Sequence, residues 1–551
     1  MSIRSFLYCL IICLLFCCKK SKSPETPPAS FNFNTATVNE VSSGLSYTNL
    51  NLTPIIKISF SAPLKTSSVS SSVSFTSNSG TTVAFTSTLE NSNSTLIIKP
   101  AAPLQAFGKY LLEISIGLFS ENGGSLERPV SLSLSTGMDS TDKFPLISDD
   151  ALLTLIQQQT FKYFWDFGHP ISGLARERNT SGDVVTSGGS GFGIMAIVIA
   201  VNRQFITRVE GLARMQKIVE FLKTKADKFH GAFPHWLNGG SGSVVPFSQK
   251  DNGADLVETS FLMEGLLIAR QYFNGPELGE STLRNDINTL WNAVEWNWFR
   301  KNNETVLYWH WSPNYNWEIN QPITGWNECL ITYVLAASSP NYAIPKTVYD
   351  NGWAKNGAIK NGNYYYNIQL PLGSPSGGPL FFAHYSFLGI NPNNLKDAYA
   401  DYGMQNKAHT LINYNYCRTN LKDYYGYSDA CWGLTASDDI NGYLAHEPNN
   451  DNGVISPTAA ISSLPYTPDE SMRAIRFFYY KLGDKIWKNY GFVDAFSLKD
   501  GWFANSFLAI DQGPEIAMIE NYRSGLLWNL FMSCPEVKTG MRSLGFQGPD
   551  L

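Results

Sequence analysis

The sequence predicts a multidomain protein in which an N-terminal β-sandwich is followed by an all-α domain built as an (α/α) toroid. The chain has 551 residues, whereas a single hydrophobic core stops growing at about 250–300 residues. Short alternating runs rich in Ser, Thr, Val and Ile occupy residues 31–137, and such runs are typical of strands. After Gly137 the apolar residues recur at helical spacing, which indicates helices packed on a core.

The first residues have the pattern of an export signal. A basic start precedes an apolar stretch, Phe6 to Phe16, that is too short to span a bilayer. Leu15-Phe16-Cys17-Cys18 resembles a bacterial lipobox, and the resemblance implies cleavage before Cys18 and acylation of that cysteine. We therefore expect a lipoprotein signal peptide at residues 1–18, a flexible tether at residues 19–30, and a protein lipid-anchored to the bacterial cell envelope. An ordinary signal peptide or membrane anchor is the alternative, and the side that the anchor faces stays open.

Residues 31–137 are expected to form a β-sandwich of about seven strands. The strand-like runs are Ile55 to Phe60, Val73 to Phe75, Val83 to Phe85, Thr95 to Ile98, Tyr110 to Ile116 and Val130 to Leu134. The phrases Ile58 to Leu64 and Lys99 to Leu104 resemble the bacterial Ig-like domains that act as spacers in surface proteins. All 14 tryptophans lie after residue 150, so this domain has no Trp with which to stack on a sugar. We therefore prefer a spacer role over carbohydrate binding.

The helical domain is expected at residues 149–535. Its predicted helices are Asp149–Phe167, Gly191–Asn202, Arg208–Phe229, Asn252–Phe273, Ser281–Trp298, Trp326–Ala337, Lys396–Asn420, Pro468–Leu482 and Pro514–Ser533. The sequence has no helical repeat, which disfavours a solenoid. About a dozen helices joined by long aromatic loops fit a toroid, in which an inner ring of helices closes round a cavity.

Composition excludes several kinds of partner. The formal net charge is −5, and no basic stripe could neutralise a phosphate backbone, so we expect no nucleic acid partner. We assign no metal to the four cysteines outside the leader, which lack C-x-x-C spacing: Cys329, Cys417, Cys431 and Cys534. Residues 436–442 and 449–453 look loosely like calcium loops but lack the full pattern. We expect no metal, no cofactor and, by default, a monomer.

The sharpest acidic cluster lies at the start of a predicted helix. If that helix begins near Asn252, Asp251, Asp255 and Glu258 stand at i, i+4 and i+7 and share one face. Three carboxylates on one stripe repel each other and raise the pKa of at least one, as a general acid near neutral pH requires. The alternative is that Asp251 is an N-cap and the others stabilise the first turns. We prefer a site because the stripe carries no Lys or Arg until Arg270.

Glu328 is a second candidate. It is predicted in the first turn of an otherwise apolar helix, Trp326–Ala337. A lone acidic residue there is usually a partner of the helix dipole. From the position of Glu328 in the sequence alone, a catalytic role and this structural role are equally supported.

A third acidic segment runs from Ala509 to Arg523. Pro514 fits a helix start. Glu520 and Arg523 can pair at i and i+3, which is a structural role for both. Asp511 and Glu515 are left without a local partner.

Loops dense in aromatic side chains complete the set of candidates. Aromatic faces interleaved with Asn, Gln and His suit pyranose rings, which offer an apolar C–H face and a rim of hydroxyls. These loops are Phe233 to Trp236, Tyr308 to Trp311, Tyr315 to Trp317 and Tyr424 to Tyr427. Buried aromatic side chains more often belong to a hydrophobic core. A core role explains clusters of this density in loops less readily than sugar binding does.

At these motifs the chain resembles the glycoamylase-like catalytic domain and, more closely, glycoside hydrolase family 144, whose members act on β-1,2-glucan. The resemblance runs from about Asp149 to Phe531. It rests on residues 160–166, 188–193, 255–261, 442–446, 455–460 and 519–523. It implies an (α/α)6 barrel with a large pocket, hydrolysis with inversion at the anomeric carbon, and a catalytic role for Asp251, Asp255 and Glu328.

Inversion needs a carboxylic acid that protonates the leaving oxygen and a carboxylate base that activates water, ~6.5–9.5 Å apart. The resemblance favours Glu328 as the acid, acting directly or through a bound water or sugar hydroxyl, and leaves the base open among Asp251, Asp255 and Asp511. The residues that we assign to substrate binding are Glu258, Trp236, His235, Trp309, Trp311, Trp326, Tyr427, His446, Glu515, Glu520, Tyr522 and Arg523. We expect an endo-acting glucanase. The alternatives are an exo-acting enzyme on β-linked gluco-oligosaccharides and a surface lipoprotein that captures glycans without cutting them.

Overall fold

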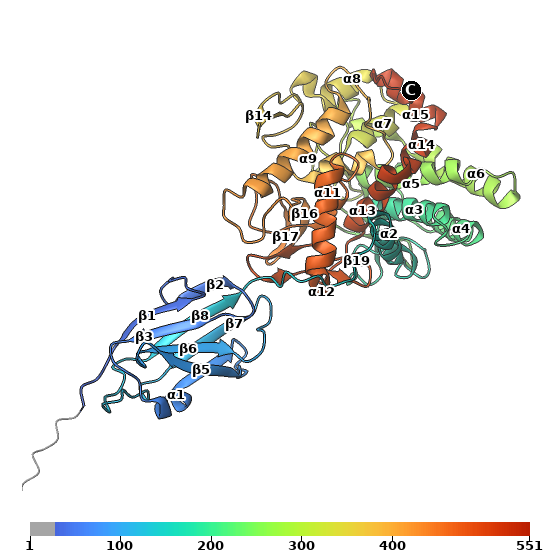
Figure 1. Ribbon diagram of the computed structural model, residues 1–551. Coiled ribbons are helices and arrows are strands. Elements are labelled where there is room, and N and C mark those ends of the chain that lie inside the picture. The colour runs from blue at the N-terminus through green and yellow to red at the C-terminus, as the bar shows by residue number, and fades with distance from the viewer. Residues whose placement is uncertain (1–27) are drawn as a thin grey trace, which may run out of the picture. The chain divides into compact units, whose positions relative to one another are not determined.

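The structure is a computed structural model that describes residues 28–551. The predicted signal peptide, its Cys18 and the tether up to residue 27 lie outside the described residues. The chain divides into two compact units, Met1–Asp139 and Ser140–Leu551 (Figure 1). Among residues 28–551, no helix has both the length and the apolar character needed to cross a membrane.

The first unit is a β-sandwich of two four-stranded sheets. One sheet has the strand order β1-β3-β6-β5 and the other β2-β8-β7-β4. The strands are β1 (Phe33–Val38), β2 (Ser46–Leu50), β3 (Ile56–Phe60), β4 (Val73–Ser77), β5 (Phe85–Glu90), β6 (Thr95–Pro100), β7 (Lys109–Ile114) and β8 (Val130–Thr136), with one short helix, α1 (Thr66–Ser72). Alternate residues of β8 are buried, so the period-2 pattern of the sequence places its apolar side chains between the sheets.

Two strands of this sandwich were not predicted. β1 pairs antiparallel with β3, and β2 pairs parallel with β8. Both strands are largely polar, with only two buried residues each. They therefore lack the alternation by which the other six strands were found.

The second unit is helical. Its α-helices are α2 (Asp149–Trp165), α3 (Ser187–Asn202), α4 (Arg208–Thr224), α5 (Leu256–Tyr272), α6 (Leu278–Ala293), α7 (Leu330–Ser338), α8 (Lys346–Val348), α9 (Tyr402–Thr419), α10 (Pro457–Ile461), α11 (Pro468–Arg476), α12 (Leu482–Ile486), α13 (Ala509–Ser524), α14 (Leu526–Met532) and α15 (Pro535–Leu544). Single 3-10 or π turns are η1 (Trp296–Arg300), η2 (Tyr349–Trp353), η3 (Lys355–Gly357), η4 (Leu380–Ala383), η5 (Tyr385–Phe387) and η6 (Phe477–Lys481).

Short strand pairs lie in the loops of this unit. They are β9 (Val184–Thr186), β10 (Trp236–Asn238), β11 (Val244–Val245), β12 (Ala254–Asp255), β13 (His310–Trp311), β14 (Tyr364–Tyr365), β15 (Ile368–Gln369), β16 (Ala436–Asp439), β17 (Gly442–Ala445), β18 (Trp487–Lys488), β19 (Gly491–Phe492), β20 (Phe496–Ser497) and β21 (Trp502–Phe503). The pairing of β12 with β13 is antiparallel and sets Asp255 opposite His310.

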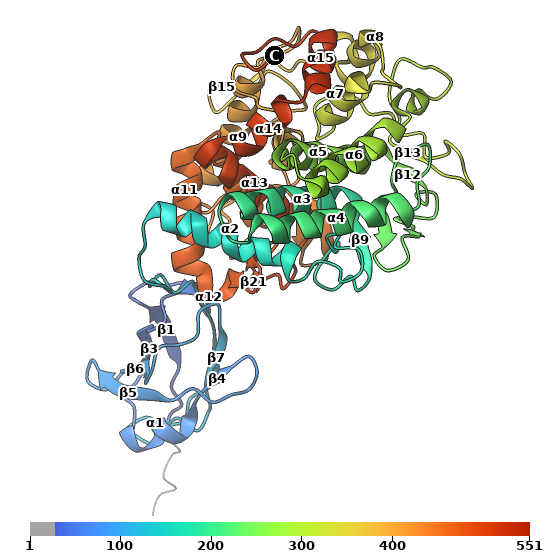
Figure 2. The same cartoon turned by 90° about the vertical axis from the view of Figure 1, so that its right-hand side faces the viewer.

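An inner set of helices forms the core of the helical unit. α3 packs against α5 and α13, and α5 packs against α7 (Figure 2). α10 also packs against α13. α3 and α5 are buried on nearly every side, whereas α4 and α6 are buried along one face only and lie outside them. Two glycines allow α3 and α5 to approach closely, because a Cβ at Gly191 would lie 2.1 Å from the Phe261 carbonyl oxygen and a Cβ at Gly265 would lie 2.2 Å from that of Gly191.

Several predicted helix starts were wrong, since α3 begins at Ser187 rather than Gly191 and α9 begins at Tyr402 rather than Lys396. Three more lie at the acidic segments. α5 begins at Leu256 rather than near Asn252, because residues 254–255 are extended and pair with β13. α7 begins at Leu330, so Glu328 precedes the helix instead of standing in its first turn. α13 begins at Ala509, so Pro514 lies inside this helix and not at its start.

Candidate active site

The candidate acidic residues meet where the inner helices begin. Asp255 caps α5, Glu328 immediately precedes the N-cap of α7, and Asp511 lies in the first turn of α13. Glu258 follows in the first turn of α5, and its carboxylate reaches Gly188 at the start of α3. Helix N-termini carry unpaired N–H groups and a partial positive charge, which stabilise carboxylates.

Asp255 is surrounded by hydrogen-bond donors. Its Oδ1 accepts from the backbone N–H groups of Val257 and Glu258, at 3.0 and 2.9 Å. Its Oδ2 accepts from His235 Nδ1 at 3.0 Å and from Trp309 Nε1 at 3.2 Å. Burial by itself would raise the pKa of Asp255, but these donors and the neighbouring histidines hold it below its usual value. Asp255 is therefore an ionised carboxylate with both oxygens engaged.

Asp251 differs from Asp255 although it is only four residues away. Its carboxylate contacts His310 Nε2 at 3.3 Å. Burial and the charge of Asp255 raise the pKa of Asp251 to about 7, against the opposing effect of His235. Burial also lowers the pKa of His310, so that imidazole is neutral. Two adjacent carboxyl groups thus have their pKa values moved in opposite directions, which is the arrangement that acid/base chemistry uses.

His235 supplies positive charge to the cluster. Burial alone would lower the pKa of His235, but the charges of Glu258, Asp255 and Asp251 and the hydrogen bond to Asp255 raise it to about 9. The imidazolium lies 3.9 Å from Glu258 Oε1. Glu258 Oε2 accepts from Gly188 N at 2.8 Å and from Thr186 Oγ1 at 3.1 Å. A Cβ at position 188 would lie 2.6 Å from this oxygen, so a larger residue there would displace the Glu258 carboxylate.

Glu328 has the protonation behaviour of a general acid. Burial, with the charges of Glu258 and Asp255, raises the pKa of Glu328 to about 7. Its side chain remains partly exposed to solvent, and its backbone carbonyl accepts a hydrogen bond from Ser386 Oγ in η5. The residue is therefore fixed between α7 and η5.

A second acidic group lies at the start of α13. Asp494 and Asp511 are buried. Burial and the charge of Asp438 raise the pKa of Asp494 to about 7, against the lowering effect of its hydrogen bond with Asp511. Burial and the charge of Asp494 raise the pKa of Asp511 well above its usual range. Asp494 Oδ2 accepts from Asp438 N at 2.6 Å, and Asp438 pairs with Arg178 at 3.1 Å. Tyr385 lies between the two acidic groups, since Asp511, Glu328 and Glu258 all influence its pKa, which burial raises most.

Comparison with known proteins identifies the family. Residues 320–535 match the glycoamylase family model, described as "Putative glucoamylase". The structure of an endo-β-1,2-glucanase from Chitinophaga pinensis, in complex with sophorotriose and glucose, is 54% identical and covers 74% of this chain and 100% of that chain, with a TM-score of 0.72. The chain belongs to the glycoamylase-like glycoside hydrolases of family 144. Residues 34–136 match the model described as "Bacterial Ig-like domain", which confirms the type of the N-terminal sandwich.

Two further relatives come from Parabacteroides distasonis. A solved β-1,2-glucanase is 37% identical and covers 95% of this chain and 74% of that chain, with a TM-score of 0.71. A curated protein named exo β-1,2-glucooligosaccharide sophorohydrolase (non-reducing end) is 47% identical over 428 residues, which are 74% of this chain. The chain spans 59% of the length of that curated relative.

Some of the predicted binding residues of this family-144 chain lie at the acidic cluster. His235 and Trp309 bond Asp255 directly. Trp236 is half-buried, with its ring 4.9 Å from that of the exposed Phe247. Trp311 follows His310 in β13, and its half-buried ring lies 5.3 Å from that of Trp298. The Trp311 ring therefore packs with Trp298, whereas His310, the residue before it in the strand, faces the acidic cluster.

Three other predicted binding residues are buried away from a ligand. Trp326 packs among Trp353, Phe387 and other aromatic rings of the core. The buried hydroxyl of Tyr427 donates to Asp451 at 2.7 Å. His446 is 1% exposed. We withdraw the assignment of these three side chains to substrate binding, because no sugar could reach them without repacking the fold.

The C-terminal half of α13 also departs from the prediction. Glu520 does not pair with Arg523, because Arg203 on α3 pairs with it at 2.7 Å. Arg523 instead contacts Asp150 on α2, also at 2.7 Å. Tyr522 is exposed at the opposite end of α13 from Asp511. These residues lie far from the acidic cluster, since each residue of a helix advances its axis by about 1.5 Å. Glu515 is buried one turn after Asp511, and burial raises its pKa well above the usual range.

Sequence reasoning missed several residues of the site. Asp494, Asp438 and Tyr385 come from segments that carry no helical pattern. A signal for Asp494 was present, because it is the single charged residue in the buried run 491–498. His310 was noted only as part of an aromatic loop, although its position opposite Asp255 makes it a neighbour of two carboxylates.

One group of metal-type donors lies close together within residues 28–551. Ligand atoms of His235, Asp251 and Asp255 lie within 4.8 Å of one another. With a pKa of about 9, His235 is protonated at neutral pH and offers no lone pair to a metal. The loops at 436–442 and 449–453 are also held by protein donors, since Asn452 bonds Asp439 and Lys422 bonds the Asp451 carbonyl. These contacts describe a hydrogen-bonded ion-pair network.

Proposed function

We propose that the chain is an endo-acting β-1,2-glucanase that cleaves its substrate with inversion of the anomeric configuration. The observation that carries the proposal is the protonation of the two carboxyl groups assigned below as acid and base. The pKa of Glu328 and that of Asp251 are both raised to about 7, so near neutral pH one group can carry a proton while the other is ionised. Glycoside hydrolysis by two carboxyl groups needs one group in each of these states.

Glu328 acts as the general acid in this proposal. Because its pKa is about 7, a large fraction of the group carries a proton at neutral pH. The proton passes to the glycosidic oxygen as the bond to the anomeric carbon breaks, directly or through a water or sugar hydroxyl. The leaving chain thus departs as a neutral alcohol.

Asp251 is the best-supported base among the three candidates. Asp255 has both oxygens taken by donors, and burial raises the pKa of Asp511 well above the usual range, which disfavours its ionised form. Asp251 is 6% exposed, and a pKa of about 7 leaves part of it ionised at neutral pH. It removes a proton from the water that attacks the anomeric carbon, while His310 orients its carboxylate.

The inner helices support the (α/α)6 arrangement that we propose for the catalytic domain, residues 149–535. Packing runs from α13 to α3, α5 and α7. α7 in turn packs against η5. His384, the residue before η5, lies with its Nε2 3.0 Å from Oγ of Ser463, which follows α10 in the sequence. α10 packs against α13 again. A closed ring of this kind places all inner N-termini, and hence all the acids, on one face.

The remaining parts of the chain receive supporting roles in the proposal. The Ig-like sandwich at residues 31–137 serves as a spacer, and residues 19–30 as a tether. Acylation of Cys18 anchors the protein to the bacterial cell envelope. The enzyme works as a monomer, and Glu258, His235, Trp236, Trp309 and Trp311 bind the glucan.

A second candidate is an exo-acting enzyme that releases a disaccharide, and the activity named for the curated relative favours it. The deciding experiment incubates the purified chain with linear β-1,2-glucan and, in parallel, with β-1,3-, β-1,4- and α-1,4-glucans. We expect a spread of oligosaccharides from β-1,2-glucan alone at early times. A single early product would establish the exo mode, and no cleavage of any glucan would refute the enzyme assignment. Glu328→Gln is expected to fold normally and lose at least about 10³-fold in kcat.

A further inference from the structure

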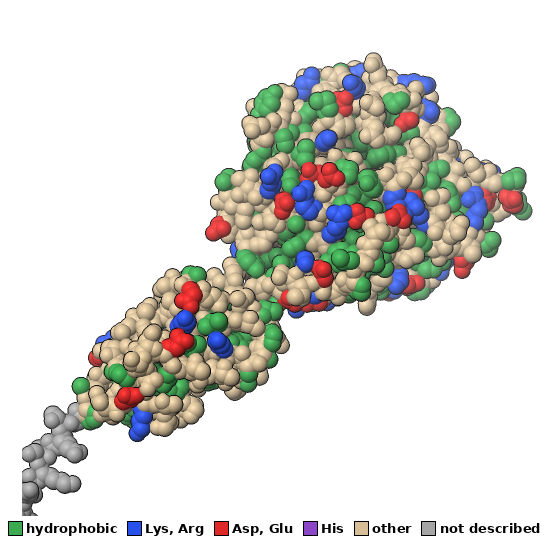
Figure 3. Space-filling model, viewed as in Figure 1, with side chains coloured by type: hydrophobic (Ala, Val, Ile, Leu, Met, Phe, Trp, Pro, Cys, Tyr) green, Lys and Arg blue, Asp and Glu red, His purple; other side chains and the backbone are tan. Residues whose placement is uncertain are grey.

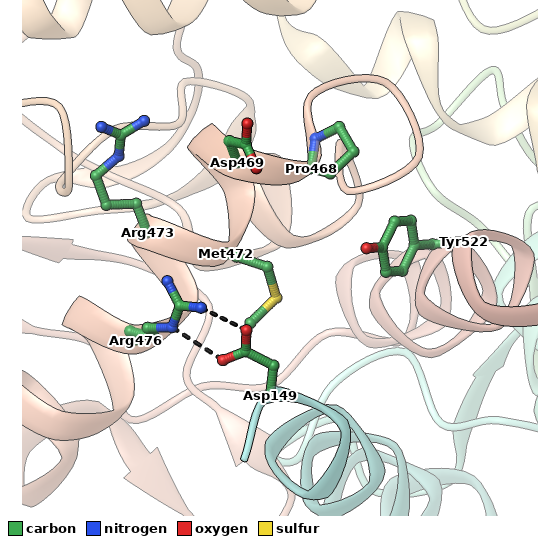
Figure 4. Close-up of a pocket in the computed structure, with 7 residues that line it drawn as sticks. All are labelled: Asp149, Pro468, Asp469, Met472, Arg473, Arg476 and Tyr522. Carbon is green, nitrogen blue, oxygen red and sulfur yellow. Dashed lines mark hydrogen bonds and ion pairs between the residues drawn. The ribbon is translucent and has the colours of Figure 1, made fainter. Parts of the chain in front are cut away.

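A surface cavity of about 510 Å³ lies where α2 and α11 begin and α13 ends (Figure 4). It is lined by Asp149, Pro468, Asp469, Met472, Arg473, Arg476 and Tyr522. The volume falls within the ~300–1,000 Å³ range of small-molecule sites. In the view of Figure 3, acidic and basic side chains lie intermixed on the face of the helical unit that Figure 1 labels α11.

This cavity is separate from the acidic cluster. Asp511 and Tyr522 belong to the same helix, α13, and stand eleven residues apart. At about 1.5 Å per residue, their backbone positions are about 16 Å apart along the helix axis. The acidic cluster therefore lies at the N-terminal ends of the inner helices, and the cavity lies at the other end of α13.

The lining of the cavity is more polar than apolar, because four of its seven residues are charged. Pro468, Met472 and the ring of Tyr522 supply its apolar part, and Tyr522 is 43% exposed. Within residues 28–551, the Tyr522 hydroxyl makes no hydrogen bond and points into the cavity (Figure 4). An aromatic face with free hydrogen-bonding groups beside it is the surface that a pyranose ring requires.

The charges around the cavity balance. Arg476 Nε lies 2.9 Å from Asp149 Oδ1, and a second nitrogen of this guanidinium contacts Asp149 Oδ2. Arg473 Nη1 lies 3.3 Å from Asp429 Oδ2, and Asp469 is the other acidic residue of the lining. Because each arginine already faces a carboxylate, the cavity favours a neutral ligand over a phosphate or another anion.

The position of Tyr522 is fixed by its neighbours in the helix. Glu520 pairs with Arg203, and Arg523 pairs with Asp150 and bonds Gln157 Oε1 at 2.7 Å. These contacts tie α13 to α3 and α2 on either side of the tyrosine. The backbone at Tyr522 is therefore held in place, which lowers the entropy cost of binding a ligand at this position.

We propose that this cavity is an accessory binding site for a neutral gluco-oligosaccharide segment, remote from the site of cleavage. The inference rests on the proposed function for the identity of the sugar. A glucan held at this cavity stays close to the enzyme, so its effective concentration at the acidic cluster rises. The effect grows with chain length, because a short oligosaccharide cannot occupy both sites.

The test measures binding in the Glu328→Gln background, so that no glucan is consumed. Retention during electrophoresis is compared in gels with and without linear β-1,2-glucan, with no short oligosaccharide added, because such a ligand would compete at the cavity as well as at the acidic cluster. We expect Tyr522→Ala to lower the retention at least about threefold, and Tyr522→Phe to lower it less because the ring remains. Tyr364→Ala, which removes another exposed tyrosine, is the matched control and should change nothing.

Equal retention of Tyr522→Ala and its parent would overturn the inference. Thermal unfolding of each variant shows whether it is folded. If Tyr522→Ala does not fold, the retention of Tyr522→Phe is compared with that of the parent instead. If the parent binds no β-1,2-glucan, the proposed substrate fails, and the same comparison is made with β-1,3- and β-1,4-glucans. Loss of retention in Tyr522→Ala on one of those glucans would uphold the site, whereas binding to none of them would reject it.

Discussion

His235 and Asp255 form a hydrogen-bonded ion pair, with 3.0 Å between His235 Nδ1 and Asp255 Oδ2. Asp255 is at the same time the N-cap of α5, so one carboxylate links the start of an inner helix to the loop that precedes β10. The charge of His235 also opposes the rise in pKa that burial imposes on Asp251 and Glu258. The protonation of the whole acidic cluster therefore depends on this imidazolium.

Removal of that charge should move the pH dependence of the enzyme. In His235→Gln the pKa of Asp251 rises, because burial and Asp255 are no longer opposed by His235. The base is then protonated over a wider range, so the acidic limb of kcat/KM should move to higher pH by at least about 0.5. His230→Gln, at a histidine that pairs with Glu295, is the control. If the acidic limb of the kcat/KM profile does not move in His235→Gln, the charge of His235 does not influence the pKa of the base.

The wild-type enzyme should have a bell-shaped pH profile of kcat/KM with its optimum near pH 7. Activity falls on the alkaline side as Glu328 loses the proton it must donate, since its pKa is about 7. Activity falls on the acidic side as Asp251 gains a proton and can no longer accept one, since its pKa is also about 7. A profile flat between pH 5 and 9 would contradict both assignments. The measurement follows reducing ends released from linear β-1,2-glucan.

Two amide substitutions should distinguish the base from its buried neighbour. Asp251→Asn removes the proton acceptor, so kcat should fall at least about 10³-fold. Burial raises the pKa of Asp511 well above its usual range, which favours the protonated form that Asn resembles. We therefore expect Asp511→Asn to keep kcat within about tenfold of wild type. If kcat falls more in Asp511→Asn than in Asp251→Asn, Asp511 is the base instead of Asp251.

Glu264 offers a test of stability against pH, away from catalysis. It is fully buried in α5, burial raises its pKa well above the usual value, and its Oε1 accepts from Gly389 N at 2.8 Å. A carboxyl group with a raised folded-state pKa stabilises the fold below its unfolded pKa and loses that contribution as pH rises toward the folded pKa.

Glu264→Gln keeps the shape and cannot ionise, so it should be more stable than wild type at neutral and alkaline pH. The difference should grow by about 1.4 kcal/mol per pH unit above pH 5 until the folded-state pKa is reached. Thermal unfolding at pH 5, 6, 7 and 8 provides the measurement. Glu536→Gln, at a half-buried residue whose carboxylate pairs with Arg270, is the comparison and should show no such gain. Parallel curves for wild type and Glu264→Gln would contradict the prediction.

The periodicity of the sequence located most helices but not the ends that matter for the site. α2 was predicted to begin at Asp149 and does so, because Ser148 caps it and the apolar stripe starts at once. The start of α5 was missed because Asp255 pairs with β13, fifty-five residues away in the sequence. Pairing of this kind leaves no local pattern in the sequence. For that reason the sequence predicted correctly that the three acids cluster, but placed them wrongly on one face of a helix.

The sequence by itself determined that a strand-rich Ig-like domain precedes a helical domain, and that acids at 251, 255, 258, 328 and 511 deserved testing. These conclusions follow from spacing along the chain, which fixes the periodicity of local structure. Only the tertiary structure decided which acids are protonated. That depends on burial and on donors such as His235 and Trp309 that the fold brings to Asp255 from distant segments. It also placed Tyr522 in a cavity of its own, because a helix about 24 Å long exposes its two ends to different surroundings.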